Sequence, residues 1–213
     1  MKILLLAWPR TGSKAVHENL CNYVNQCTSS NIKTTEGYEL FVNEDNIKNS
    51  LEVVKSKDSF VVKIHPHEKK YSFEVLRNIA KHFDYTIILD RDRFDQETSR
   101  LVCNRTTFFS NNEDQVNAKN NAESYLFIAD VEEFKKKVTE VRYLDWPHCH
   151  IPNSHNVMFE DFVNVSNSKE FCKWLQLEEV DFNYYPGSIE YSESKEKMIS
   201  NYKELHNWYI TRK

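Results

Sequence analysis

Lys2-Ile3-Leu4-Leu5-Leu6-Ala7 is the stretch that decides the fold, and it continues directly into Trp8-Pro9-Arg10-Thr11-Gly12-Ser13-Lys14. The first part is almost continuously apolar, which is typical of a strand buried on both faces of a parallel sheet. The second part carries turn residues, and residues 14–26 then repeat apolar side chains at helical spacing. A strand, a turn and a helix in this order predict an α/β protein.

The alternation of strands and helices continues along the chain. Further strands are predicted where apolar and β-branched residues run together, at residues 60–64, 85–89 and 155–159. Helices are predicted from apolar spacing and start signals, at residues 44–56, 72–83, 94–102, 130–143, 167–176 and 193–209. The polar, Asn-rich residues 104–123 are predicted to form a loop. We therefore expect one domain, residues 1–213, in three layers, with helices on both faces of a central, mainly parallel sheet.

Composition and charge argue against several classes of function. A formal net charge of −4 does not suit a general nucleic-acid binder, which would carry a basic surplus. No segment approaches the run of about 20 apolar residues that crosses a membrane, and the apolar N-terminus does not have the cleavage site of a signal peptide. Five scattered cysteines without metal or redox spacing favour reduced thiols. We expect a cytoplasmic protein without a nucleic-acid or membrane partner.

The loop after the first predicted strand has the composition of an anion-binding site. Arg10 and Lys14 are cations, Thr11 and Ser13 offer hydroxyl donors, and Gly12 permits a close backbone approach. Backbone N–H groups at the start of the following helix would attract an anion as well, because they form the positive end of the helix dipole. The loop is not a Walker A motif, because a first glycine and a Ser or Thr after the lysine are missing. A plain turn with solvated charges is the alternative interpretation.

Two more strand ends carry polar residues of interest. His65 follows the second strand, at the sheet edge where a general base would be useful. Arg91 leaves the third strand and Ser99 lies on the helix after it, so a guanidinium and a hydroxyl could meet on one phosphate. In parallel sheets, ligands bind beyond the carboxyl ends of the strands. Each feature also has a structural interpretation: a histidine that ends a strand, and a helix start stabilised by salt bridges.

Taken together, these segments resemble the sulfotransferases that use 3′-phosphoadenosine 5′-phosphosulfate (PAPS). Pro9-Arg10-Thr11-Gly12-Ser13 is similar to the family's 5′-phosphosulfate loop, and Lys63-Ile64-His65-Pro66 to the strand end that carries its catalytic histidine. Arg91 with Ser99 is similar to its 3′-phosphate motif. Met158-Phe159-Glu160-Asp161-Phe162 resembles its Tyr-Glu-Asp-Leu segment, with Phe159 in place of the tyrosine. The resemblance covers residues 1–177.

The resemblance implies in-line transfer of a sulfuryl group from PAPS, as co-substrate, to an acceptor hydroxyl. His65 would be the general base, Arg10 would stabilise developing charge, and no metal is required. The expected donor-binding residues share a place at the strand ends or on the elements that follow: Arg10, Thr11, Gly12, Ser13, Lys14, Arg91, Ser99 and Phe159. The family's Gly-x-x-Gly-x-x-Lys segment is missing, so Arg100 or residues 211–213 would have to substitute at the 3′-phosphate.

Other assignments stay open at the level of sequence. A P-loop kinase for a nucleotide or small molecule shares the strand, loop and helix at the start, and Asp90 could hold its Mg²⁺. A sulfotransferase-like binding protein without catalysis is the non-enzyme alternative. The polar and aromatic composition of residues 31–45 and 104–123 favours a sugar or another small hydroxylated acceptor. The sequence does not define the oligomeric state.

Overall fold

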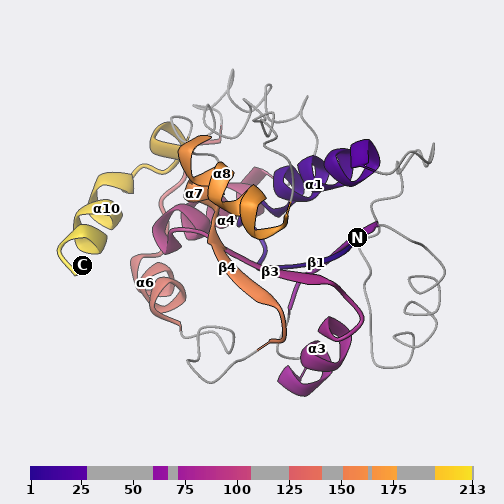
Figure 1. The fold of residues 1–213 in the computed structure, drawn as a ribbon. Coiled ribbons are helices and arrows are strands. Elements are labelled where there is room, and N and C mark those ends of the chain that lie inside the picture. The colour runs from indigo at the N-terminus through magenta and orange to yellow at the C-terminus, as the bar shows by residue number, and fades with distance from the viewer. Residues whose placement is uncertain are drawn as a thin grey trace. The chain divides into compact units, whose positions relative to one another are not determined.

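The computed structural model describes residues 1–27, 60–66, 72–106, 125–140, 151–162, 165–176 and 195–212. Strands and helices alternate along them (Figure 1), in the order β1 (Lys2–Ala7), α1 (Ser13–Cys27), β2 (Phe60–Ile64), α3 (Phe73–Ala80), β3 (Tyr85–Asp90), α4 (Arg93–Thr106), α6 (Val131–Thr139), β4 (Ser154–Met158), α7 (Phe159–Phe162), α8 (Val165–Trp174) and α10 (Tyr202–Ile210). An α/β fold, as the sequence predicts, is confirmed.

The chain divides into two compact units. The first consists of Met1–Arg91 and Arg142–Tyr184, and the second of Asp92–Val141 and Tyr185–Lys213. All four described strands belong to the first unit, together with α1, α3, α7 and α8. Helices α4, α6 and α10 belong to the second. Compactness does not test whether a unit folds alone, so the single domain expected from the sequence stays a prediction.

The first unit is built on a parallel sheet of strand order β2-β1-β3-β4. Its register aligns Leu5 of β1 with Lys63 of β2 on one side and with Ile87 of β3 on the other. Ile87 in turn aligns with His155 of β4. Because all strands run the same way, their carboxyl ends share one edge of the sheet (Figure 1). The predicted strands at residues 2–7, 60–64 and 85–89 are confirmed, and so is their parallel arrangement.

Alternate residues of β1 contribute to two different buried clusters. Ile3, Leu5 and Ala7 pack in one cluster with side chains of α1, α7 and α8. Leu4 and Leu6 pack in the other, which includes Leu76 and Ile79 of α3. These five apolar side chains of β1 are fully buried, and each leucine or isoleucine contributes about 1.5–3 kcal/mol. The period-two alternation of a strand therefore explains why β1 is apolar on both faces.

The second unit has its own aromatic core. Phe94 of α4 stacks on Tyr209 and meets Phe134, Tyr202 and His206 edge to face. Such ring pairs add about 0.5–1.5 kcal/mol each beyond the area that they bury. Leu205 of α10 and Val102 of α4 belong to the same buried cluster. The C-terminal segment is thus tied to α4 by side chains far from it in sequence.

Some predicted element boundaries are wrong. The helix expected over residues 193–209 is interrupted, because Ile199 pairs as a β-bridge with Phe127 and α10 begins only at Tyr202. Phe159, expected to end a strand, begins α7, since β4 ends at Met158. Helix α4 extends to Thr106, so the first residues of the predicted loop 104–123 are helical.

Two expectations fall largely outside the described part of the chain. The helix expected at residues 44–56 lies there entirely, and so does the rest of the Asn-rich segment up to residue 123.

Among the helices that the structure describes, none combines the length and the apolarity needed to cross a membrane.

Candidate functional site

The loop between β1 and α1 has an unusual backbone. Arg10 has a φ of 69° and Gly12 a φ of 78°, both in the left-handed region that residues with a Cβ rarely adopt. Thr11, between them, is fully buried. Its Oγ1 donates to the carbonyl oxygen of Trp8 at 2.7 Å, and its backbone N–H donates to the same oxygen at 3.3 Å. The Thr11 hydroxyl therefore closes the turn and stabilises the loop.

Gly12 is required by both its conformation and its neighbour. A Cβ built on it would lie 2.3 Å from Cε2 and 2.4 Å from Cδ2 of Phe159. Phe159 is itself 4% exposed and belongs to the buried cluster under α1. The first turn of α7 is therefore packed directly on the loop. Donor binding by Phe159 stays a prediction, and the contact that the structure shows is with the backbone of the loop at Gly12.

The start of α1 adds positive potential beside the loop. Ser13 begins the helix and is buried, with 7% of it exposed, while Lys14 is exposed. Helical geometry gives the first N–H groups of any α-helix no carbonyl acceptor within that helix. These groups carry the positive end of the helix dipole, which favours an anion at this position.

His65 follows β2 and contacts the end of β1. Its Nδ1 lies 2.6 Å from the carbonyl oxygen of Ala7, the last residue of β1. A carbonyl oxygen can only accept, so Nδ1 carries the proton in this contact. In the neutral ring, Nε2 then holds the lone pair that can accept a proton. His65 is half-buried, and its ring is oriented by the strand adjacent to its own.

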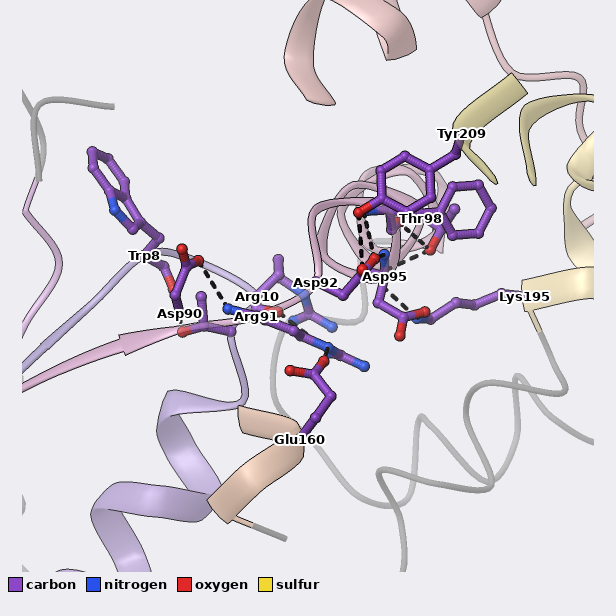
Figure 2. Close-up of polar contacts among 12 residues, drawn as sticks. Trp8, Arg10, Asp90, Arg91, Asp92, Asp95, Thr98, Glu160, Lys195 and Tyr209 are labelled. Carbon is purple, nitrogen blue, oxygen red and sulfur yellow. Dashed lines mark hydrogen bonds and ion pairs between the residues drawn. The ribbon is translucent and has the colours of Figure 1, made fainter. Parts of the chain in front are cut away.

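Arg91 links the end of β3 to the loop and to α7 (Figure 2). Its Nη1 donates to the carbonyl oxygen of Arg10 at 3.4 Å. Its guanidinium carbon lies 5.2 Å from the ring centroid of Phe159. Its Nε lies 3.7 Å from Oε1 of Glu160. Its backbone N–H donates to Oδ1 of Asp90 at 2.8 Å. Arg91 is therefore held by two segments that are distant from it in sequence, the loop after β1 and the start of α7.

Two sequence-predicted residues lie in the second unit. Ser99 is on α4 and 2% exposed, so its hydroxyl is buried within that unit. The Nε of Arg100 pairs with the carboxylate of Glu97. The Nη2 of Arg100 lies 3.6 Å from Oε1 of Glu133. The structure brings Arg10, Gly12, Arg91 and Phe159 together in the first unit, and Ser99 belongs to the other.

Sequence reasoning missed three contacts of this site. These are the Ala7 carbonyl that orients His65, the ion pair between Glu160 and Arg91, and the packing of Phe159 on Gly12. A partial signal was present, because Glu160 directly follows Phe159 at the end of a predicted strand. The pairing partners, however, come from other segments of the chain.

A polar cluster in the second unit joins α4 to the C-terminal segment (Figure 2). Asp92 accepts from the hydroxyl of Tyr209 at 2.8 Å, and it caps α4 by accepting from the N–H of Phe94 at 2.9 Å. The ammonium of Lys195, 1% exposed, lies 3.4 Å from Oδ1 of Asp95. Burial, with the charge of Asp95 next in importance, raises the pKa of Tyr202 to about 12. These contacts stabilise the unit.

Metal ligation and similarity to known proteins give no further assignment. In the part of the chain that the structure describes, no group of three or more His, Cys, Asp or Glu side chains is arranged to hold a metal ion. Comparison with models of known protein families finds no match, and comparison with curated proteins finds none either.

Proposed function

We propose that this chain is a PAPS-dependent sulfotransferase that transfers a sulfuryl group to the hydroxyl of a sugar or another small acceptor. The proposal includes a three-layer fold and a P-loop-like phosphosulfate-binding loop after β1. Alternate residues of β1 belong to two different buried clusters, and this supports a sheet covered by helices on both faces. Left-handed φ values at Arg10 and Gly12 support the loop, because they form a tight turn after β1 that leads directly into the first N–H groups of α1, where an anion is favoured.

The contact between His65 and Ala7 carries the proposal. A general base needs a nitrogen with a lone pair and a ring held in one orientation. The Nδ1 contact at 2.6 Å supplies both, because it assigns the proton to Nδ1 and ties the ring to the end of β1. The phosphate-binding loop follows that strand immediately. Base and loop thus belong to neighbouring strand ends, where ligands of parallel sheets bind.

The residues of the first unit suit an anionic donor. The N–H groups at the start of α1 and the side chain of Arg10 would hold the 5′-phosphosulfate, and Arg91 would hold the 3′-phosphate. PAPS supplies an activated sulfuryl group. His65 Nε2 would take the acceptor's proton as the acceptor oxygen bonds to sulfur and the bond from sulfur to the 5′-phosphate oxygen breaks. Arg10 would stabilise the negative charge that develops on the leaving phosphate, which is adenosine 3′,5′-bisphosphate.

A transfer assay tests this function directly. The chain is incubated with PAPS or with ATP, each beside a panel of sugars and small alcohols, and products are identified by mass spectrometry. Sulfated product with PAPS supports the proposal. Phosphorylated product with ATP would instead identify a kinase, and no product with either donor would leave the binding-protein alternative.

Replacing His65 with asparagine tests the mechanism. The asparagine amide can still donate to the Ala7 carbonyl, but it has no equivalent of Nε2. We expect transfer to fall about 10²-fold or more, while the affinity for adenosine 3′,5′-bisphosphate stays within about twofold. His82→Asn, at an exposed turn after α3, is the matched control and should keep full activity. Retained turnover with lowered stability in His65→Asn would make His65 a structural residue.

A further inference from the structure

Arg91 carries a buried donor whose hydrogen bond is not made. Its side chain is 14% exposed, and Nε has no hydrogen-bond partner among the described residues. The carboxylate of Glu160 lies 3.7 Å from that nitrogen, near enough for electrostatic attraction but beyond hydrogen-bonding distance. A buried donor without an acceptor is unfavourable, so a ligand oxygen at this position would satisfy it.

Two contacts besides the one with Glu160 orient the Arg91 side chain. Nη1 donates to the Arg10 carbonyl, and the guanidinium lies over the Phe159 ring. Both partners are neutral groups on well-packed segments. Glu160, in contrast, contributes a full negative charge and is 43% exposed, so water screens its attraction to Arg91 and makes their ion pair weak. Arg91 is therefore held by neutral contacts and neutralised by an exposed carboxylate.

We propose that Glu160 is a displaceable counter-anion of Arg91 that limits how tightly the site binds the 3′-phosphate of a nucleotide. This inference rests on the proposed function, in which Arg91 binds that phosphate. A phosphate oxygen takes the position at Nε and Glu160 moves away, but its charge still repels the phosphate. Glu160 thus weakens binding of the bisphosphate product and speeds its release. Nucleotides without a 3′-phosphate are unaffected.

Calorimetric titration of adenosine 3′,5′-bisphosphate and AMP tests the inference. We expect Glu160→Gln to lower the Kd for the bisphosphate about three- to tenfold at low salt and to leave the Kd for AMP within about twofold. Glu160→Asp keeps the charge and should behave as the wild type. The matched control is Glu170→Gln, an exposed carboxylate on α8 of the same unit, which should change neither constant.

A double-mutant cycle assigns the effect to the pair. With Arg91→Gln, bisphosphate binding weakens, and adding Glu160→Gln should lower the Kd by a smaller factor than it does in the wild type, because no carboxylate has to be displaced from Arg91. Wild-type protein that does not bind the bisphosphate would overturn the proposed function and this inference with it. The inference alone would be overturned if the wild type binds the bisphosphate but Glu160→Gln does not lower the Kd. It would also be overturned if the control Glu170→Gln lowers the Kd as much as Glu160→Gln does.

Discussion

Replacing Gly12 with alanine should destabilise the protein by about 2–5 kcal/mol. The first contribution is the backbone, because a residue with a Cβ costs about 1–2 kcal/mol at a φ of 78°. The second is steric, because the new methyl group would lie 2.3 Å from the Phe159 ring. That ring is buried in the core cluster, where overpacking costs about 1–3 kcal/mol. The total is a large part of the 5–15 kcal/mol typical of a whole domain.

Urea-induced unfolding, followed by circular dichroism, measures this loss. The variant Phe159→Leu serves as a second background, because a smaller side chain leaves room for the methyl group. There, Gly12→Ala should cost only the backbone contribution of about 1–2 kcal/mol. A Gly12→Ala protein within about 0.5 kcal/mol of the wild type would refute the reasoning, and so would an equal cost in both backgrounds.

Two further predictions concern charge and pH. Arg10→Ala should lower kcat/KM about 10- to 100-fold in the transfer assay, and it adds no backbone strain because alanine, like arginine, has a Cβ. Lys14→Ala, at an exposed position, should lower kcat/KM less. A larger effect of Lys14→Ala than of Arg10→Ala would indicate a kinase-like loop. Burial raises the pKa of Tyr202 from 10.0 to about 12, so the unfolded chain loses this proton first and stability falls as pH rises between these values. Tyr202→Phe should lose less stability over that range, and equal slopes in thermal unfolding would contradict this.

Local pattern predicted most of the sheet. The runs at Lys2–Ala7 and Phe60–Ile64 are apolar because both faces of these strands are buried, and that property is visible in a single segment. Alternation with helices then implied parallel pairing. The break before α10 was not visible, because it depends on the pairing of Ile199 with Phe127, which is distant in sequence.

The sequence by itself determined which polar residues follow which strands. We assigned residues 9–14, His65 and Arg91 to the ends of strands because the hydrophobic runs stop there. Only the tertiary structure decided what each side chain contacts. Nδ1 of His65 meets the Ala7 carbonyl, and Phe159 packs on Gly12. These partners are far apart along the chain, and a hydrogen bond or ring contact depends on distances that the packing of the sheet and helices sets.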